Sequence, residues 1–387
     1  MTIVLVGGGS GGHITPVLAV ADELKRQHPG VQLVYIAHKG DKLADVIAAH
    51  DSIDRVVSIR AGKFRRYHGE GWRQIFHIIT LLKNIRDFFW VIAGTLQSYW
   101  QLGRIKPAAI FIKGGFVGLP VGWAATARKI PYVTHDSDAI PGLTNRLLAK
   151  RAAMHAVALP ADTYPYPKEK TQTVGVPLSS DYQPVTAVLQ REYRRGLNIV
   201  EDSKVLCVTG GGLGAQRLNR AVAESLPALF KRYPELVVLH LTGRDHEAEI
   251  KNYYKTHLKE DEQKQVIVKG FVNDLYRYSA AADIIICRAG ATNLAEFAMQ
   301  RRPIVIVPNP NLTGGHQTKN AELLAKAGAA TVISETQLAQ QPNSLATVVG
   351  DLFHYAGKRQ ELGEKLGAFA QPDAARELAK LILQVSK

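Results

Sequence analysis

A histidine follows the first glycine-rich segment of the chain, where it could accept a proton or contact a ligand. Residues 7–12 read GGGSGG, and His13, Thr15 and Pro16 come shortly after them. Glycine lets a backbone approach a ligand closely, and the unpaired amides at a helix start attract phosphate. We expect Thr15 to cap a helix whose first residue is Pro16. The alternative is that His13 only hydrogen-bonds the backbone of the loop.

The same segment fits a nicotinamide-dinucleotide site poorly. That fingerprint requires an acidic residue about 20 positions further on, at the end of the second strand, to hold a ribose. Here the strand expected at residues 31–36 is followed by Ala37, His38 and Lys39. The pattern therefore argues against a dinucleotide cofactor.

A carboxylate occupies a comparable place in the second half of the chain. The apolar run 284–287 precedes a turn at residues 288–291, and Glu296 lies on the helix expected after that turn. Its carboxylate could accept hydrogen bonds from both hydroxyls of a ribose. Alternatively, it only complements the dipole of the helix.

Another polar group follows the strand-like run 304–307. Residues 314–315 are glycines that open a further helix, on which His316, Gln317 and Asn320 are the polar residues nearest the start. We expect these side chains to face the same cleft as Glu296. The alternative is that they are ordinary surface residues at a helix start.

Composition sets limits on the class of protein. The chain has 387 residues, 46% of them hydrophobic, which is enough for two domains with substantial cores. Its net charge of +14 favours a polyanionic partner such as nucleic acid, an anionic membrane face or a phosphorylated substrate. Cys207 and Cys287 both lie in apolar runs and indicate a reducing compartment rather than a disulfide framework. We recognise neither a secretory signal nor a transmembrane helix.

Strand-like and helical patterns alternate along the chain, which predicts an α/β protein with parallel sheets covered by helices. The strand–glycine–helix opening at residues 3–12 recurs at residues 205–214, which indicates two similar domains. We predict an N-terminal domain over residues 1–178 and a C-terminal domain over residues 179–370. Residues 371–387 form a last helix that could pack back on the first domain.

Aromatic and basic residues are interleaved between Arg60 and Lys106. Such a segment suits a peripheral contact with the anionic inner face of the cell membrane, where rings lie at headgroup level and cations meet acidic lipid. The alternative is that many of these rings belong to the core. The residues in question are Phe64, Trp72, Phe76, Phe88, Phe89, Trp90, Tyr99 and Trp100 with Lys63, Arg65, Arg66, Arg73, Lys83, Arg86 and Arg104.

Four motifs occur in one order across both halves: GGGSGGHITP at 7–16, GGLGA at 211–215, CRAGATNLAE at 287–296, and Gln317 with Asn320. Together they resemble the peptidoglycan N-acetylglucosaminyltransferases of glycosyltransferase family 28, and the likeness covers nearly the whole chain. The resemblance implies two Rossmann-like domains whose parallel sheets face across a cleft, the GT-B fold. It also implies an inverting mechanism without an essential metal or other cofactor.

On the donor side, the resemblance implies that the C-terminal domain binds UDP-N-acetylglucosamine. Glu296 would bind the ribose, the backbone of Val272 would meet the uracil, and His316 and Gln317 would contact the sugar hydroxyls. The other donor-binding residues implied are Gly211, Gly212, Leu213, Gly214, Arg288, Gly290, Ala291, Thr292 and Asn320.

On the acceptor side, the resemblance implies lipid I, undecaprenyl-pyrophosphoryl-N-acetylmuramoyl pentapeptide, which the reaction converts to lipid II. His13 is the first candidate for the catalytic base and Asp136 the second. The residues that would face the acceptor are Gly11, Gly12, Thr15, Gly114, Gly115, Phe116, Asp138 and Asn145. The enzyme would work at the cytoplasmic face of the membrane, and no nucleic acid partner is expected.

The chain departs from the family pattern at several of these places. Residues 135–138 read HDSD where His-Glu-Gln-Asn is usual, and Ser179 replaces a usual arginine. Gly212 and Leu213 replace Ser-Gln, and His316 replaces a glutamine. Most of these changes bear on the acceptor. A family 28 enzyme acting on another lipid, such as diacylglycerol or a polyprenol-linked acceptor, therefore stays open.

The implied reaction is a direct displacement at the anomeric carbon by an acceptor hydroxyl whose proton a base removes. Backbone amides after Gly290 would stabilise the diphosphate leaving group. The triplet Asp136-Ser137-Asp138 is an alternative metal site. Two other classes of protein are alternatives. A nucleic-acid-binding protein would carry a recognisable binding module, and we find none in the sequence. A nucleotide-sugar epimerase would turn over the donor without an acceptor.

Overall fold

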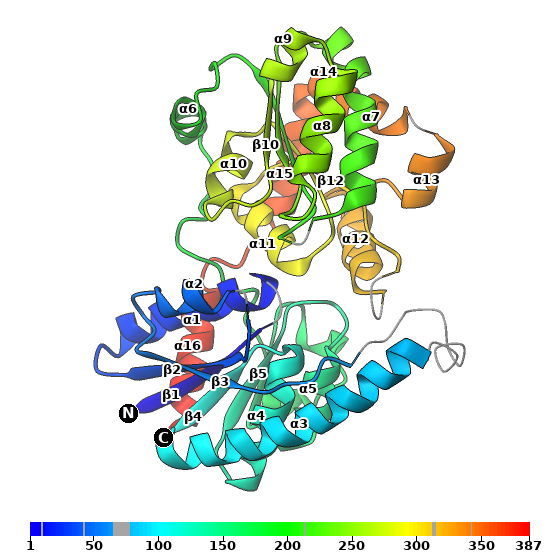
Figure 1. The fold of residues 1–387 in the computed structure, drawn as a ribbon. Helices are drawn as coiled ribbons and strands as arrows, with labels where there is room; N and C mark the ends of the chain where they lie inside the picture. The colour runs from blue at the N-terminus through cyan, green and yellow to red at the C-terminus, as the bar shows by residue number, and fades with distance from the viewer. Residues whose placement is uncertain (9–10, 42, 65–77, 213, 312–314, 342) are drawn as a thin grey trace. The chain divides into compact units, whose positions relative to one another are not determined.

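The computed structural model describes residues 1–8, 11–41, 43–64, 78–212, 214–311, 315–341 and 343–387 (Figure 1). Contacts divide the chain into two compact units. Unit 1 comprises residues 1–180, 311–316 and 371–387, and unit 2 comprises residues 181–310 and 317–370. Each unit contains one sheet of parallel strands with helices on both faces, so the predicted fold class is confirmed.

Unit 1 is built on a seven-stranded parallel sheet in the order β3-β2-β1-β4-β5-β6-β7. The order reverses between β1 and β4, because successive strands are added outward from these two in opposite directions. Ligands of open parallel sheets bind at the carboxyl ends of strands at such a switch point. The strands are β1 (Thr2–Val6), β2 (Gln32–His38), β3 (Arg55–Ile59), β4 (Ala109–Ile112), β5 (Tyr132–Asp136), β6 (Met154–Val157) and β7 (Thr171–Thr173).

Alternate residues of β1 enter two different cores. Ile3 and Leu5 pack under α1 (Gly11–Gln27) and the C-terminal helix α16 (Ala374–Val385), whereas Val4 and Val6 pack under α3 (Ile78–Ile105) and α4 (Gly115–Ala127). Figure 1 shows α16 beside α1 on one face of the sheet. The shorter helices are α2 (Ala44–Ala48), α5 (Leu143–Leu148), η2 (Ala149–Arg151), η3 (Ala161–Thr163) and η4 (Lys168–Lys170).

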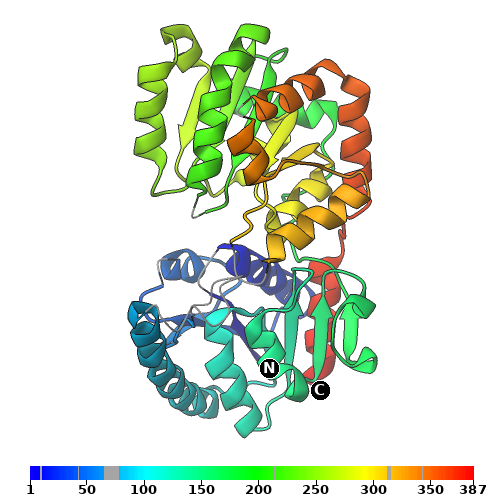
Figure 2. The same cartoon turned by 90° about the vertical axis from the view of Figure 1, so that its right-hand side faces the viewer.

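Unit 2 repeats this plan with a six-stranded parallel sheet in the order β10-β9-β8-β11-β12-β13 (Figure 2). Its switch point lies between β8 and β11. The strands are β8 (Lys204–Thr209), β9 (Leu236–Leu241), β10 (Val266–Lys269), β11 (Ile284–Cys287), β12 (Ile304–Ile306) and β13 (Thr331–Val332). The helices are α6 (Ala187–Gly196), α7 (Gln216–Arg232), α8 (Glu247–His257), α9 (Glu260–Lys264), α10 (Leu275–Ala281), α11 (Ala291–Gln300), α12 (His316–Lys326), α13 (Glu335–Gln340), α14 (Ser344–His354) and α15 (Ala356–Gly367).

The start of α1 differs from the sequence prediction. The helix begins at Gly11, so Thr15 lies inside it rather than at its cap, and Pro16 lies within the helix rather than at its first position. A proline near a helix start removes one amide, and that amide would otherwise bond the carbonyl four residues before it. The glycines at 11 and 12 adopt helical geometry, and the histidine consequently sits on the first turn of α1 instead of in the loop before it.

The aromatic segment contains one long helix. Asp87, Val91, Ser98 and Leu102 form the buried face of α3, which lies along α4 (Figures 1 and 2). Among the described residues, no helix combines the length and the apolar character needed to cross a bilayer. The predicted contributors Arg65, Arg66, Trp72, Arg73 and Phe76 lie outside the described residues.

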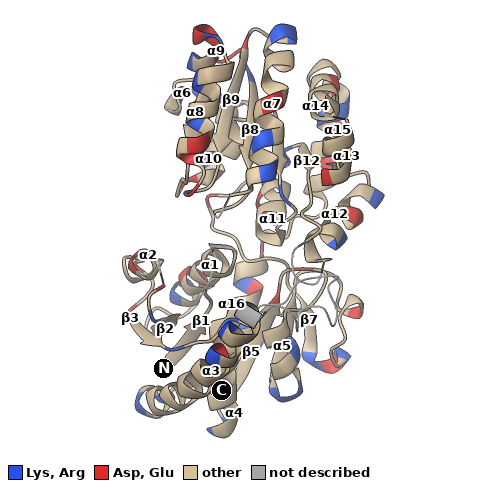
Figure 3. Ribbon diagram, turned by 45° about the vertical axis from the view of Figure 1, so that its right-hand side comes forward, with Lys and Arg blue, Asp and Glu red and all other residues tan. Residues whose placement is uncertain are grey.

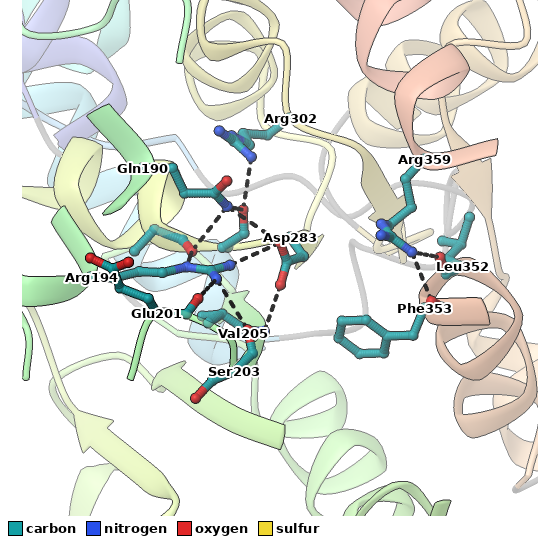
Figure 4. A network of polar contacts seen from close by, with 12 residues as sticks. Gln190, Arg194, Glu201, Ser203, Val205, Asp283, Arg302, Leu352, Phe353 and Arg359 are labelled. Carbon is teal, nitrogen blue, oxygen red and sulfur yellow. Dashed lines mark hydrogen bonds and ion pairs between the residues drawn. The ribbon is translucent and has the colours of Figure 1, made fainter. Parts of the chain in front are cut away.

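A network of polar contacts fastens α6 to the sheet of unit 2 (Figure 4). The guanidinium group of Arg194 donates to the carbonyl oxygens of Ala281 (3.0 Å) and Ser203 (3.1 Å) and to Asp283 Oδ1 (2.8 Å). The other oxygen of Asp283 accepts the amide of Val205 at the start of β8 (2.8 Å). Because Arg194 is buried, these contacts replace its hydration and hold the first helix of unit 2 against the starts of β8 and β11.

Candidate active site

Two glycine segments meet at the switch point of unit 1. Gly8 follows β1, and Gly114 and Gly115 follow β4, both with positive φ (+109° and +74°). A β-carbon on Gly115 would lie 2.8 Å from the carbonyl oxygen of Gly8. Only glycine combines this conformation with this approach. The loops after β1 and β4 therefore pack backbone to backbone at the sheet edge where ligands are expected.

His13 lies beside this junction. Its Cδ2 atom is 3.7 Å from the position of a β-carbon on Gly115, and its ring is half-buried. The pKa of His13 is lowered to about 4, mainly by burial and also by the positive charges of Lys113 and Lys63, while Asp138 opposes the lowering. His13 is therefore neutral at pH 7 and can accept a proton, although such a low pKa makes it a weak base.

The other predicted acceptor-side residues line the same edge with differing exposure. Phe116 is half-buried in the first turn of α4, where its ring meets His38 edge-on with centroids 5.3 Å apart. Gly11 and Gly12 form the first turn of α1, and Thr15 is exposed on it. Gly9 and Ser10 lie outside the described residues.

Asp136 ends β5 and has both carboxylate oxygens occupied. Oδ1 accepts the amide of Gly142 (3.0 Å) and Oδ2 accepts the hydroxyl of Tyr166 (2.7 Å). Burial raises the pKa of Asp136, and these two hydrogen bonds oppose the rise. The geometry thus suits Asp136 to holding the loop after β5, whereas half-buried Asp138 acts on His13 through its charge.

Asn145 joins the β5 end to the glycines after β4. Its Nδ2 donates to the carbonyl oxygen of His135 (2.9 Å) and lies 3.6 Å from the position of a β-carbon on Gly114. Its Oδ1 has no hydrogen-bond partner among the described residues, and the same holds for His135 Nδ1 and Ser137 Oγ. The β5 end therefore presents polar atoms that a ligand or water could satisfy.

Lys113 also belongs to this group, although sequence reasoning missed it. It follows β4 directly, and its side chain is buried, with only 5% of the residue exposed. The signal was a lysine between an apolar strand and two glycines, which is an unusual place for a residue that is normally exposed.

The glycine loop after β8 occupies the switch point of unit 2. Gly211 and Gly214 have φ of +83° and +78°, and a β-carbon on Gly214 would overlap the carbonyl oxygen of Thr242. Exposed Gly212 approaches the ring of Phe271, which precedes half-buried Val272. Leu213 lies outside the described residues. The loop after β8 is thus held closely against the loop that follows β9.

Helix α11 starts on the other side of that switch point. Gly290 is its N-cap and has no side chain to bond the first amides, which are those of Ala291, Thr292 and the next residue. The positive end of the helix dipole at such a helix start suits an anion such as a diphosphate. Further along α11, Glu296 is buried, and burial raises the pKa of its carboxyl group to about 8 while a hydrogen bond from Tyr182 opposes the rise. Sequence reasoning did not find Tyr182.

Arg288 is engaged within unit 2. Its Nη1 donates to the carbonyl oxygen of Val307 (2.9 Å), and its Nη2 pairs with Glu335 Oε1 (2.6 Å). Glu335 also pairs with Arg217 (2.9 Å). The guanidinium group of Arg288 therefore ties the β11 and β12 ends to α13 in this structure.

The polar residues of α12 also touch neighbouring strand ends. Gln317 Oε1 accepts the amide of Asn309 after β12 (2.9 Å), and Asn320 Nδ2 donates to the carbonyl oxygen of Ala289 after β11 (3.0 Å). His316 is the first residue of α12, and its Nδ1 has no partner among the described residues. Gln317 and Asn320 thus lie with Gly290 at the β11–β12 edge.

The predicted site residues that the structure describes thus lie at two sheet edges, one in each unit. In the described part of the chain, no group of three or more His, Cys, Asp or Glu side chains could hold a metal ion, and this includes Asp136 and Asp138.

The fold has a close counterpart among solved structures. The crystal structure of Acinetobacter baumannii MurG superposes with a TM-score of 0.71 at 25% sequence identity, covering 99% of each chain. The two Rossmann-like units with glycine-rich loops at both switch points have the GT-B fold that this glycosyltransferase also has.

Sequence comparisons identify the family within the GT-B fold. The family 28 glycosyltransferase N-terminal domain matches residues 3–157, and the C-terminal domain matches residues 205–378. The chain is 32% identical to the UDP-N-acetylglucosamine--N-acetylmuramyl-(pentapeptide) pyrophosphoryl-undecaprenol N-acetylglucosamine transferase of Symbiobacterium thermophilum, covering 100% of this chain and 97% of the relative. It is 30% identical to the Bacillus subtilis protein of the same name, covering 100% of both. The chain belongs to glycosyltransferase family 28.

Proposed function

We propose that this enzyme transfers N-acetylglucosamine from UDP-N-acetylglucosamine to the lipid-linked N-acetylmuramyl pentapeptide of peptidoglycan synthesis, lipid I, forming lipid II. The main support for the proposal is the sequence similarity, over nearly the full length of both chains, to relatives that are named for this activity. Both switch points of the chain carry the glycine loops that two diphosphate-containing substrates require.

The donor is assigned to unit 2. The amides of Ala291 and Thr292 at the start of α11 bind its diphosphate, and Glu296 accepts hydrogen bonds from the ribose hydroxyls. Val272 meets the uracil through its backbone, and His316, Gln317 and Asn320 contact the sugar. Arg288 acts through its ion pair with Glu335, which holds the turn before α11. The glycines 211, 212 and 214 let the β8 loop approach the nucleotide, and Leu213 belongs to the same loop.

The acceptor is assigned to unit 1, along Gly11, Gly12, Thr15, Gly114, Gly115, Phe116, Asp138 and Asn145. His13 removes the proton from the acceptor hydroxyl, which attacks the anomeric carbon as the bond to the UDP oxygen breaks. The configuration at that carbon inverts. The amides of α11 stabilise the charge that develops on the leaving diphosphate. Asp136 holds the β5 loop through its bonds with Gly142 and Tyr166 rather than moving a proton.

The lipid acceptor requires a membrane surface, and α3 supplies a suitable one. Phe89 and Trp100 are 62% and 67% exposed on the helix face opposite Val91 and Leu102, and they continue an exposed apolar stripe. Lys and Arg residues are interspersed along the same helix (Figure 3). Rings at headgroup level with cations toward anionic lipid would seat the enzyme peripherally on the cytoplasmic face.

The test is incubation of the purified enzyme with labelled UDP-N-acetylglucosamine and lipid I in anionic vesicles. We expect label to enter lipid, and release of UDP without labelled lipid would refute the proposal. Conversion of the donor to an epimeric UDP-sugar in the absence of acceptor would instead indicate the epimerase alternative.

A second candidate is transfer to another lipid, such as diacylglycerol or a polyprenol-linked sugar. It is favoured by the HDSD stretch at residues 135–138 and by Ser179, which stand on the acceptor side. A panel of acceptors at one donor concentration separates the two candidates, because only the true acceptor should reach a high kcat/KM.

A further inference from the structure

The ammonium group of Lys113 lies in an unusual environment. Its side chain is 5% exposed at the carboxyl end of β4, next to the positive-φ glycines that begin α4. Its backbone amide donates to the carbonyl oxygen of Val6 (2.9 Å), which fixes it beside β1 at the switch point. In the part of the chain that the structure describes, no hydrogen bond or ion pair joins its ammonium group to another residue.

Lys113 is only 5% exposed, so its ammonium group loses most of its hydration without a hydrogen bond or ion pair among the described residues to replace it, which is costly. The two carboxylates that act on it electrostatically are those of Asp138 and Asp136. Both are otherwise engaged: Asp136 bonds Gly142 and Tyr166, and Asp138 also acts on His13. The charge of Lys113 is therefore available to an anion that enters from the sheet edge.

The surroundings suit a phosphate group. Helix α4 begins at Gly115, beside the Gly8–Gly115 junction, and a helix start attracts anions. Ser137 Oγ is buried without a partner among the described residues, and its hydroxyl can donate a hydrogen bond to an anion. A hydroxyl donor, a helix start and one largely buried lysine together form a compact anion site.

We propose that Lys113 binds a phosphate group of the lipid-linked acceptor, and that the bound anion relieves the repulsion between Lys113 and His13. This inference rests on the proposed function for the identity of the anion, but the anion site itself does not. It assigns Lys113 two effects, one on acceptor affinity and one on the basicity of His13.

The second effect follows from the charges around His13. Burial is the main cause that lowers the pKa of His13; Lys113 after β4 and Lys63 after β3 add to the lowering, and Asp138 after β5 raises the pKa. Burial also lowers the pKa of His135 well below its usual range, and the charge of Lys113 adds to that lowering. The diphosphate of the acceptor carries one negative charge on each phosphate, and its binding at Lys113 offsets the positive charge there. The pKa of His13 then rises, and His13 becomes a stronger base when the acceptor is present.

The experiment is an NMR titration of the full chain with ¹⁵N-labelled histidines, in which His13→Gln identifies the His13 signal. The probe is inorganic pyrophosphate, added to wild type, Lys113→Met and Lys113→Gln. Lys168→Met removes an exposed lysine of the same unit and serves as the matched control. Thermal unfolding checks that each variant is folded.

In wild type and Lys168→Met we expect pyrophosphate to raise the pKa of His13. Both Lys113 variants should begin with a higher His13 pKa, show little further change, and bind pyrophosphate about 10- to 100-fold more weakly, as expected for a lost charge-assisted hydrogen bond. In turnover, they should raise KM for the lipid acceptor and leave KM for UDP-N-acetylglucosamine unchanged.

Pyrophosphate affinity within twofold of wild type in both Lys113 variants, with an unaltered His13 titration, would overturn the inference. An equal loss of affinity for UDP-N-acetylglucosamine would overturn the acceptor assignment. If no transfer to lipid I occurs while the titration still depends on Lys113, the proposed function fails and the anion site stands.

Discussion

The hydroxyl group of Tyr182 donates a hydrogen bond to the buried carboxyl group of Glu296. Tyr182 is the second residue of unit 2, and its ring also meets Tyr276 edge-on with centroids 6.1 Å apart. The first residues of the unit are therefore joined to the carboxyl group that we assign to the donor ribose. A ribose that bonds Glu296 must share this carboxyl group with Tyr182 or displace it.

Burial of Glu296 should make the stability of the enzyme depend on pH. Its pKa is about 8 in the folded state and about 4.5 when unfolded, so between these values the folded state retains a proton that the unfolded state has lost. The free energy of unfolding therefore falls as pH rises through this window, by up to about 1.4 kcal/mol per unit. Glu296→Gln should remove this slope in urea unfolding from pH 5 to pH 8.

Two further variants sharpen this measurement. Tyr182→Phe removes the hydrogen bond that lowers the pKa of Glu296, so the decline in stability should extend to higher pH. Glu260→Gln changes an exposed carboxylate of the same unit and should leave the slope as it is. A wild-type slope that persists in Glu296→Gln would show that another group titrates.

His13→Ala should lower kcat by about 10²- to 10⁴-fold, the usual contribution of a general base. KM for the donor should not change, because the residue lies in unit 1. Since His13 must be neutral to act, kcat/KM for the acceptor should fall as pH drops through its free-enzyme pKa near 4. Steady-state kinetics from pH 4 to pH 8 test both points, and unchanged turnover would remove His13 from the mechanism.

The sequence was sufficient to predict the strands at both switch points. Apolar β-branched runs such as 3–6 and 284–286 are buried on both faces of a parallel sheet. Continuous apolar runs of this kind are typical of such buried strands, so their sequence predicts them directly. Strands β3 (Arg55–Ile59) and β7 (Thr171–Thr173) have a weaker sequence signal, because they are the edge strands of their sheet and polar residues are tolerated there. The start of α1 was missed because cap and proline preferences are weaker than the packing that extends the helix to Gly11.

Candidate site residues could be proposed from the sequence where a motif places them beside a glycine turn, as for His13 and Gly290. Lys113 and Tyr182 carry no such signal. The burial of Lys113 could not be predicted from the sequence, because it depends on β1 and β5, which pair with β4 only in the folded sheet. The contact of Tyr182 with Glu296 spans more than a hundred residues. Likewise, nothing in the sequence showed that Arg288 would be engaged by Glu335.

The apolar face of α3 should govern membrane binding. Replacing Phe89 and Trp100 together with Ala should weaken co-sedimentation with anionic vesicles by about tenfold or more, because two large rings lose their place in the headgroup region. Tyr355→Ala removes an exposed ring from unit 2 and serves as the control. Turnover of a water-soluble acceptor should not change in either protein. Equal vesicle binding by wild type and the double variant would exclude α3 as the contact.

Arg194 should be the main stabilising contact between α6 and the rest of unit 2. Arg194→Met leaves the carboxylate of Asp283 without its guanidinium partner and frees the carbonyl oxygens of Ala281 and Ser203. Removing one partner of a buried ion pair typically costs about 3–5 kcal/mol. Urea unfolding should show this loss, whereas Arg195→Met, which changes the exposed neighbour, should alter stability by about 0.5 kcal/mol or less. Similar losses in the two variants would mean that α6 is held by its apolar contacts and not by the Arg194 network.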